Sequence, residues 1–343
     1  MNILHILPEF EEGGVERHVL ALANGQAARG HTVYVVSAGG KLERLLKEPN
    51  PIHLPVHRKN LFTAFFSAFR IARRVKTEKI DLLHAHSRVP AWIAWWASCM
   101  SGVPWIATCH AYYSKNIGLT PYGRARKLLC VSDGVRRFFE GLFPDIPSTT
   151  IYNGLDAPVG EWIPSGGEMI RFLFIGRLTK KKGVDVLLEA LGRLHDLSWT
   201  LDIVGDGPMM EVLRSDVYSM HIDHKVRFIG FHDTPDELMT TASCFLFPSL
   251  QEGMGLTLMR AVQMGLPVLS SDLPPVRELL LDPAEKQVPC LLPPGDVGAW
   301  EDALRRFIIY RRTGGAFDSR KIPNVEEMVE KVENAYFDVV KYS

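Results

Sequence analysis

Short apolar runs alternate with longer helical segments along the first half of the chain. The runs are about five residues long, and apolar residues recur at helical spacing between them. The strand-like runs are Ile3–Leu7, Thr32–Ser37, Ile80–Ala85, Trp105–Cys109 and Leu128–Val131, and the first helical segment is Val15–Arg29. This alternation predicts βαβ units and a parallel sheet.

The alternation stops at residues 157–168, a segment rich in Pro and Gly, and then restarts. Its composition indicates a linker. The later strand-like runs are Arg171–Ile175, Thr200–Val204, Val226–Ile229, Cys244–Phe247 and Val268–Ser270. We therefore predict two doubly wound α/β domains, residues 1–156 and 169–323, followed by a terminal helix in residues 324–343 that could pack back on the first domain. Ligands bind such sheets at the carboxyl ends of the strands, so we expect the site in the cleft between the domains.

Composition refines this picture mainly by exclusion. A chain of 343 residues with 46% hydrophobic residues is long enough for two domains. Its five cysteines are scattered without paired spacing, which argues against a disulfide framework or a zinc site and favours a reducing cytoplasm. The first residues lack a basic leader and are typical of a buried strand. The apolar stretch Ala91–Met100 is too short to span a membrane, so a buried helix is expected there.

Charge is distributed unevenly, although the net charge is zero. Residues 1–150 carry 19 basic and 11 acidic side chains, which favours an acidic partner for the first domain. Within it, Arg58–Lys76 predicts a basic amphipathic helix with Phe62, Phe65, Phe66 and Phe69 at helical spacing. Basic charge beside aromatic bulk suits an anionic membrane surface. The alternative is an ordinary helix that covers the sheet and has a solvated basic edge.

The run Phe247–Arg260 joins an apolar strand, a glycine-flanked acid and the start of a helix. The helix opening near Gly255 has backbone N–H groups without intrahelical partners, which favours a bound phosphate. Glu252 would then lie beside whatever that phosphate carries. Taken alone, the run would more often be a loop acid beside an ordinary helix start.

A basic loop follows an earlier strand of the same domain. Arg177 comes directly after Gly176, and Lys180, Lys181 and Lys182 precede a helix. Arg177 could clamp a phosphate bidentately while a lysine adds a point charge; a solvated basic loop is the alternative. The turn Gly205-Asp206-Gly207-Pro208 is interpreted as structural, because its glycines suit a tight strand-to-helix turn.

In the first domain, Gly13-Gly14 opens the first helix, where small residues let a ligand approach the backbone. Three histidines, His84, His86 and His110, stand at strand ends and could face the cleft. A satisfied, hydrogen-bonded pair is the favoured reading of His84 and His86. The sequence has no Asp-x-Asp at a strand end and no cluster with metal-ligand spacing, so a metal-independent site without a cofactor is expected.

Taken in order, eight motifs resemble those of the family 4 retaining glycosyltransferases of GT-B fold. They are Gly13-Gly14-Val15-Glu16-Arg17, His84-Ala85-His86, Thr108-Cys109-His110, Val131-Ser132, Tyr152-Asn153-Gly154-Leu155-Asp156, Gly176-Arg177 with Lys182-Gly183, Gly205-Asp206-Gly207-Pro208 and Glu252-Gly253-Met254-Gly255. The resemblance covers nearly the whole chain. It implies that a nucleotide-diphosphate sugar binds mainly to the C-terminal domain and the acceptor to the N-terminal one.

The resemblance also implies residue roles. Arg177 and Lys182 would hold the diphosphate above amides of Gly255, Leu256 and Thr257, and Gly14 would approach the distal phosphate. Glu252 would bind hydroxyls of the transferred sugar, His110 would contact the sugar near its reacting face, and Phe231 and His232 would receive the base. The leaving phosphate would help to deprotonate the acceptor on the same face.

One position departs from the family pattern. The family usually has a second glutamate eight residues after the first, which reaches the ribose hydroxyls, and Arg260 stands there. A carboxylate accepts hydrogen bonds from a diol, whereas a guanidinium only donates. Arg260 therefore donates to ribose oxygens, adds charge near the diphosphate, pairs with a nearby acid, or marks weakened donor binding.

The predicted protein is a retaining transferase that uses a UDP- or GDP-sugar and a saccharide or lipid-linked acceptor of cell-envelope polysaccharide or lipopolysaccharide synthesis. Its expected place is the cytoplasm, peripheral on the inner face of the membrane if the basic aromatic helix binds there. No nucleic-acid partner is expected. The alternatives are a nucleotide-sugar-binding protein whose activity was weakened or lost with Arg260, and a GT-B epimerase or phosphorylase.

Overall fold

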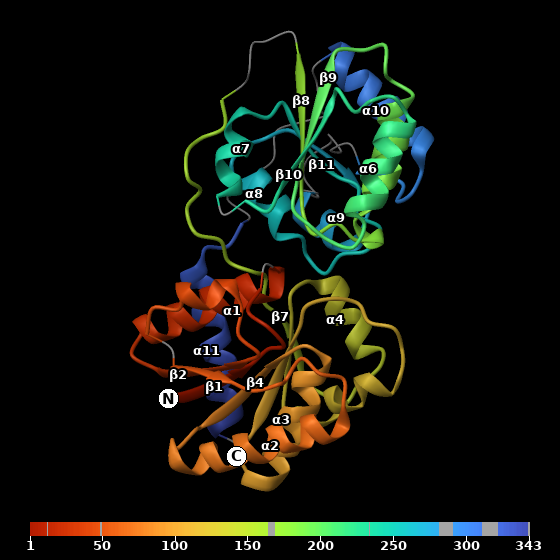
Figure 1. The fold of residues 1–343 in the computed structure, drawn as a ribbon. Coiled ribbons are helices and arrows are strands. Elements are labelled where there is room, and N and C mark those ends of the chain that lie inside the picture. The colour runs from red at the N-terminus through yellow and green to blue at the C-terminus, as the bar shows by residue number, and fades with distance from the viewer. Residues whose placement is uncertain are drawn as a thin grey trace. The chain divides into compact units, whose positions relative to one another are not determined.

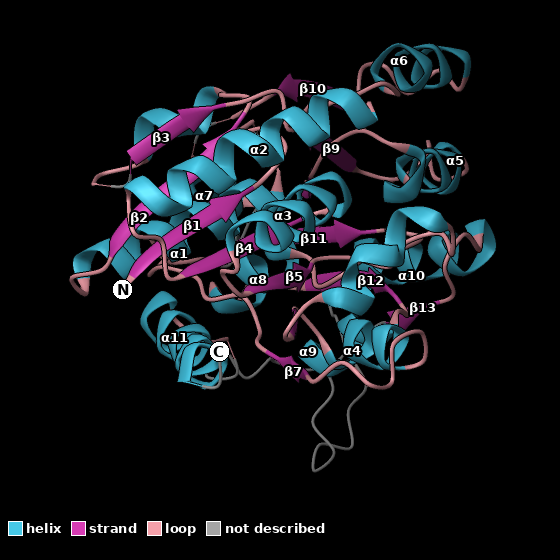
Figure 2. Ribbon diagram, turned by 90° about the horizontal axis from the view of Figure 1, so that it is seen from below, coloured by secondary structure: helices cyan, strands magenta, loops and turns pink. Residues whose placement is uncertain are grey.

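The computed structural model describes residues 1–11, 13–48, 50–163, 169–232, 234–280, 291–310 and 322–341. The chain divides into two compact units: Met1–Asp156 with the C-terminal segment from Pro323, and Ala157–Ile322. Each unit has a parallel sheet with helices on both faces (Figures 1 and 2). This confirms the predicted fold class of two doubly wound α/β domains.

The first unit has a seven-stranded sheet in the order β3-β2-β1-β4-β5-β6-β7. Its strands are β1 (Asn2–Ile6), β2 (Thr32–Ser37), β3 (Asn50–His53), β4 (Leu82–His86), β5 (Trp105–Cys109), β6 (Leu128–Cys130) and β7 (Ser148–Thr150). The chain builds outward from β1 in one direction and then from β4 in the other. The point between β1 and β4 is therefore the topological switch point, where doubly wound sheets hold their ligands.

The helices of the first unit lie on the two faces of this sheet. α1 (Gly14–Ala28) and the terminal α11 (Val325–Lys341) cover one face, and α2 (Leu61–Thr77) and α3 (Arg88–Ser101) pack together over the other (Figures 1 and 2). The remaining helical segments are η1 (Lys41–Leu45), η2 (Ile117–Arg124) and α4 (Asp133–Glu140). No helix among the described residues is long and apolar enough to cross a membrane.

The terminal helix α11 completes the first unit although it is last in the chain. Its apolar residues Met328, Val329 and Val332 join one core cluster with strand residues such as Ile3. A Cβ placed on Gly25 would lie 2.6 Å from Val329 Cγ2, so a larger residue on α1 would force the two helices apart. The close packing of α1 on α11 thus depends on a glycine.

The second unit repeats the design with a six-stranded sheet in the order β10-β9-β8-β11-β12-β13. Its strands are β8 (Ile170–Ile175), β9 (Trp199–Val204), β10 (Val226–Gly230), β11 (Cys244–Phe247), β12 (Val268–Ser271) and β13 (Leu291–Leu292). Its helical segments are η3 (Lys180–Lys182), α5 (Val184–Gly192), α6 (Met210–Ser219), α7 (Pro235–Thr241), α8 (Leu256–Gln263), α9 (Pro274–Leu280) and α10 (Val297–Tyr310). The switch point of this sheet lies between β8 and β11.

Two local features differ from the sequence-based expectation. The short strands β3 and β7 were not predicted, because Asn, Pro, Ser and Thr dominate them and give no apolar run. The segment expected to be a linker bonds to the second unit over residues 157–163: Val159 N–H donates to Asp236 Oδ2 at 3.1 Å, and Trp162 Nε1 donates to the Ala242 carbonyl at 2.8 Å. The rest of that segment, residues 164–168, lies outside the described residues.

We expect Tyr336→Phe to destabilise the first domain by about 1–3 kcal/mol, since it would leave a buried histidine nitrogen without a partner. The Tyr336 hydroxyl lies 2.6 Å from Nδ1 of His84, and both residues are fully buried. Tyr34→Phe is the matched control in the same domain, because its hydroxyl donates at 3.1 Å to the half-buried Glu78, which water can reach. Urea unfolding followed by circular dichroism measures both. Equal midpoints for the two variants would contradict this role of Tyr336.

Candidate functional site

Two loops of the second domain meet at the carboxyl ends of β8 and β11. The first runs from Gly176 to Gly183, and the second runs from Pro248 to Gly255. Leu250 N–H donates to the Lys181 carbonyl at 2.7 Å, and Lys181 Nζ donates to Gln251 Oε1 at 2.8 Å. The two loops are thus joined by backbone and side-chain bonds at the switch point.

Gly183 permits the closest approach of the two loops. Its φ is +63°, in the left-handed region, and a Cβ placed there would lie 2.1 Å from the carbonyl oxygen of Pro248. A side chain at this position would both strain the backbone and push the loops apart. The glycine therefore sets how near the basic loop comes to the acidic one.

Lys182 and Glu252 form an ion pair across the two loops, with Lys182 Nζ donating to Glu252 Oε1. Ser249, which is fully buried, also donates its hydroxyl to Glu252 Oε1 at 2.8 Å. The ammonium lies 5.7 Å from the centroid of the Phe247 ring, within reach of a cation–π interaction. The structure thus brings together two residues that the sequence analysis had placed in one site from separate motifs.

The helix α8 begins beside this pair. Gly255 precedes it with a φ of +87°, and a Cβ there would lie 2.7 Å from the Phe247 ring. No side chain caps this helix end, and its first turn holds no acid. The amides of Leu256 and Thr257 therefore belong to a helix start whose positive dipole end can accept an anion.

The remaining predicted donor residues lie around these loops. Arg177 is exposed after β8. Phe231 is 36% exposed after β10, and Thr234 N–H lies 3.3 Å from His232 Nδ1 in the same loop. The turn at Gly205 is structural, as interpreted, because a Cβ there would lie 2.2 Å from the Gly176 carbonyl oxygen.

Arg260, the residue that departs from the family pattern, pairs with an acid. Its Nε lies 3.3 Å from Oδ1 of Asp236, and its Nη1 donates to Gln263 at 2.7 Å. Asp236 also accepts from the Val159 amide, so the guanidinium joins α8 to α7 and to the segment that enters the domain. Among the four roles predicted for Arg260, the structure contains the ion pair with a nearby acid.

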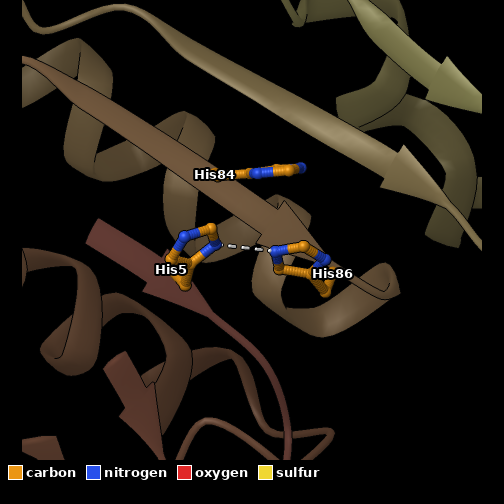
Figure 3. A group of neighbouring side chains, drawn as sticks. All are labelled: His5, His84 and His86. Carbon is orange, nitrogen blue, oxygen red and sulfur yellow. Dashed lines mark hydrogen bonds between the residues drawn. The ribbon is translucent and has the colours of Figure 1, made fainter. Parts of the chain in front are cut away.

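In the first domain, strand alternation places histidines on one face of the sheet. Leu82, His84 and His86 alternate along β4 and point to the same face, and His5 on β1 is the register partner of His84. Leu82 packs in the apolar core under α11, whereas the histidines continue the same row toward the carboxyl end. Figure 3 shows the rings of His5, His84 and His86 gathered at the switch point between the two strands.

His84 and His86 are both hydrogen-bonded, as predicted. The hydrogen bonds described below join them to other residues and not to each other. His84 lies 2.7 Å from Thr108 Oγ1 in addition to its contact with Tyr336. His5 Nδ1 lies 3.0 Å from His86 Nε2, and His86 Nδ1 lies 3.2 Å from Nε2 of His110. Burial lowers the pKa of His84, His86 and His110 well below the usual range, so these rings are neutral near pH 7.

His5 and His18 were not predicted to belong to the site. His18, on α1, lies with its ring centroid 4.8 Å from that of His110. Side chains alternate between the two faces of the sheet along β1. His5 could therefore have been placed on the same face as His84 once the pairing of β1 with β4 was known. The sequence has no cluster with metal-ligand spacing, but the fold brings histidines from separate elements together. His5, His84 and His86 form one group whose ring nitrogens lie within 4.8 Å of one another, and His18, His86 and His110 form another.

Gly14 is the first residue of α1, at the same switch point. Gly13 precedes it as the N-cap without a side-chain hydrogen bond, and a Cβ on Gly13 would lie 2.0 Å from Glu16 Oε2. The Glu16 carboxylate therefore lies against the start of α1, where the helix dipole favours a negative charge. Gly14 and His110 consequently stand in the first domain, whereas the other predicted site residues stand in the second.

Comparison with known proteins identifies the class. The family described as Glycosyltransferase Family 4 matches residues 12–158, and the family described as Glycosyl transferases group 1 matches residues 170–309. A phosphatidyl-myo-inositol mannosyltransferase from Mycobacterium leprae is 32% identical over 325 residues, which cover 85% of this chain and 83% of the relative. An N-acetyl-alpha-D-glucosaminyl L-malate synthase from Bacillus anthracis is 25% identical over 285 residues, 74% of each chain. The chain belongs to the group 1, family 4 glycosyltransferases.

Solved structures agree with this assignment at the level of fold. A glycosyltransferase from Rickettsia africae matches with a TM-score of 0.77 at 20% identity, covering 100% of this chain and 99% of that one. Anabaena HepE, solved in complex with UDP and glucose, matches with a TM-score of 0.74 at 18% identity, covering 99% and 96%. The predicted GT-B fold is thereby confirmed, and the family models and the relatives named above confirm the transferase class.

We expect Gly183→Ala to destabilise the second domain more than Gly265→Ala does. Both glycines have positive φ, +63° and +76°, so both variants carry a backbone cost of about 1–2 kcal/mol. Only at Gly183 does the new Cβ collide with another backbone atom, whereas nothing lies within 4 Å of a Cβ on Gly265. Thermal unfolding of the two variants measures the difference, and equal losses would show that the loop contact is not required.

Proposed function

We propose that this glycosyltransferase moves a sugar from a UDP- or GDP-linked donor to a saccharide or lipid-linked acceptor of cell-envelope polysaccharide or lipopolysaccharide synthesis, with retention of the anomeric configuration. The observation that carries the proposal is the Lys182–Glu252 pair beside the uncapped start of α8. A cation, a helix dipole and a carboxylate within one pair of loops suit a diphosphate joined to a polyhydroxyl group.

In the proposed donor complex, Arg177 and Lys182 bind the diphosphate together with amides at the start of α8. Glu252 accepts hydrogen bonds from hydroxyls of the sugar. Its carboxylate must therefore either bind Lys182 and the sugar at the same time or release Lys182 when the sugar binds. Phe231 and His232 receive the base. The UDP and UDP-glucose complexes of Anabaena HepE support the donor class proposed here.

The proposed reaction depends on stabilising the leaving diphosphate. The anomeric C–O bond to the phosphate breaks, and the acceptor oxygen forms its bond to the same carbon on the same face. The departing phosphate oxygen takes the proton of the acceptor hydroxyl. Lys182, Arg177 and the α8 amides supply the positive charge that a metal ion would otherwise supply, so we propose that transfer needs neither a metal nor a cofactor.

The first domain supplies His110 and Gly14 in this proposal. The ring of His110 is held by His86 and lies beside His18, so its orientation is fixed before substrate arrives. A side chain held in this way can contact the sugar near its reacting carbon without an ordering cost. Gly14 leaves room at the start of α1 for the distal phosphate or the acceptor.

We expect Lys182→Met to lower kcat by about 10²–10³-fold, the usual effect of removing one group that stabilises transition-state charge. Lys181→Met is the matched control, because this neighbouring lysine carries the same charge but bonds to Gln251 instead of Glu252. The measurement is nucleotide release from a panel of UDP- and GDP-sugars, with and without saccharide or lipid-linked acceptors.

The outcomes separate the functions considered. Turnover of one donor with a glycoside product, lost in Lys182→Met and kept in Lys181→Met, supports the proposal. Donor binding without turnover would favour the nucleotide-sugar-binding alternative. Release of an isomerised donor or of a free sugar phosphate would favour an epimerase or a phosphorylase.

We further propose that the first domain binds the inner face of an anionic membrane through α2. This helix buries Ala64, Ala68 and Ile71 and exposes its phenylalanines, of which Phe62 is 88% and Phe66 56% exposed. The exposed apolar side chains of this surface are Leu61, Phe62, Phe65, Phe66 and Phe69, and the exposed basic ones are Arg58, Lys59, Arg70, Arg73, Arg74 and Lys76. Aromatic bulk beside several cations complements an anionic bilayer surface.

The double variant Phe62→Ser/Phe66→Ser should reduce co-sedimentation with vesicles that contain phosphatidylglycerol by at least about tenfold, because two exposed rings no longer insert. Ile309→Ser/Tyr310→Ser is the matched control, since these residues of α10 are 55% and 67% exposed. Binding should weaken with salt and be low on neutral phosphatidylcholine vesicles. Equal sedimentation with and without anionic vesicles would count against this surface.

A further inference from the structure

Three histidine rings from separate elements converge in the first domain. His86 ends β4, His110 follows β5, and His18 comes from the first half of α1; one ring nitrogen from each lies within 4.8 Å of those of the others. His86 and His18 are 0% and 4% exposed. Nε2 of His18 is buried and has no hydrogen-bond partner among the described residues.

The hydrogen bonds around these rings determine where their protons lie. Gln26 Oε1 lies 2.8 Å from His5 Nε2, so this nitrogen carries the proton and the neutral ring presents a lone pair at Nδ1. His86 Nε2 must then donate to His5 Nδ1, which leaves a lone pair on His86 Nδ1.

Hydrogen bonding fixes the proton of His18 in the same way. Asn153 Oδ1 lies 2.8 Å from its Nδ1, so that nitrogen donates and Nε2 presents a lone pair. Two lone pairs, on His86 Nδ1 and His18 Nε2, are therefore available near the ring of His110, whose Nε2 lies 3.2 Å from His86 Nδ1 and whose centroid lies 4.8 Å from that of His18. The single proton of His110 Nε2 can satisfy only one of them. One buried acceptor nitrogen is left without a partner, which costs free energy unless a hydrogen-bond donor or a cation occupies the space beside it.

His86 and His18 each have a fixed hydrogen-bond partner on the ring nitrogen that would not bind the cation, as metal-ligating histidines do. Such histidines donate their other ring N–H to a fixed acceptor, which orients the ligating nitrogen and raises its basicity. His86 has His5, supported by Gln26, and His18 has Asn153.

We propose that His18 Nε2, His86 Nδ1 and His110 Nε2 form a binding site for a borderline divalent cation of the Zn²⁺, Ni²⁺ or Cu²⁺ class, with a further coordination position open. On binding, the proton of His110 moves from Nε2 to Nδ1, and the cation replaces the His110–His86 hydrogen bond. Three neutral imidazoles favour these ions over Mg²⁺ and Ca²⁺, which prefer oxygen ligands.

The neighbouring group of His5, His84 and His86 is a weaker candidate. The His84 ring is tilted by 37° against the His86 ring, with centroids 4.0 Å apart, and Figure 3 shows that it does not converge with the other two on one point. Both nitrogens of His84 have hydrogen-bond partners, in Tyr336 and Thr108. A cation there would have to break those contacts, whereas the site at His18 uses a nitrogen that has none.

The site goes beyond the proposed transfer reaction, which needs no metal. Since His110 is the ring proposed to contact the transferred sugar, a bound cation would hold it in place and block its contact. Micromolar Zn²⁺ should therefore inhibit transfer. The cation is a regulator or inhibitor in this proposal and takes no part in the chemistry.

The test uses the untagged full chain after chelator treatment and dialysis. Zn²⁺ binding is measured by competition with a chromophoric chelator, and Co²⁺ is added in parallel because its visible absorption reports histidine coordination. We expect one equivalent to bind, and we expect His18→Gln to weaken binding by at least about tenfold, since the loss of only an outer-shell partner of a metal ligand commonly costs that much. His53→Gln is the matched control, because His53 is exposed and bonds to Glu43 at 2.8 Å.

A second variant, His110→Gln, keeps the test decisive if His18→Gln fails to fold, as judged by circular dichroism. Loss of the Co²⁺ spectrum in either folded variant, with His53→Gln unchanged, supports the site. No binding by the unsubstituted chain, or equal binding by all variants, overturns it. These readouts do not require turnover, so they stand even if the chain proves inactive with every donor tested.

Discussion

Parallel pairing of β1 with β4 and of β8 with β11 constrains where each domain can present polar groups to a ligand. At each of these pairs the chain reverses its direction of growth across the sheet, so the helices that follow the two strands go to opposite faces. The carboxyl ends there remain uncovered by a crossover. Gly13-Gly14 and the histidines stand at the first such point, and Arg177, Lys182 and Glu252 stand around the second.

The second domain joins its two loops by opposite charges and glycines. Lys182 and Glu252 come from turns 70 residues apart in sequence, yet they pair across the loops that Gly183 lets approach Pro248. The two side chains are 24% and 11% exposed, so solvent screens this pair less than it screens an exposed one. Arg260 adds a second connection, to Asp236, and this use of its charge explains how the domain accommodates an arginine where the family usually has an acid.

The first domain buries a polar layer inside an otherwise apolar sheet face. Rings from β1, β4 and α1 satisfy most of their nitrogens with Gln26, Asn153, Thr108 and Tyr336, and burial keeps them neutral. The terminal helix α11 contributes Tyr336 to this layer and Val329 to the apolar core beneath it. The layer therefore links the end of the chain to the residues that surround His110. Within this layer, two buried nitrogens have no hydrogen-bond partner among the described residues, His18 Nε2 and Gln26 Nε2.

The sequence by itself determined the alternation of strands and helices, the two-domain α/β class and the ordered motifs that identify the family, because these depend on local periodicity and on residues at strand ends. Tertiary structure alone decided which side chains meet. His5 reaches His86 across 81 residues and His84 reaches Tyr336 across 252, through strand order and helix return that no local pattern records. The pairing of Arg260 with Asp236 likewise depends on the tertiary structure, which brings α8 and α7 together. Hydrogen bonds and ion pairs form over a few ångströms, and the distance along the chain does not predict them.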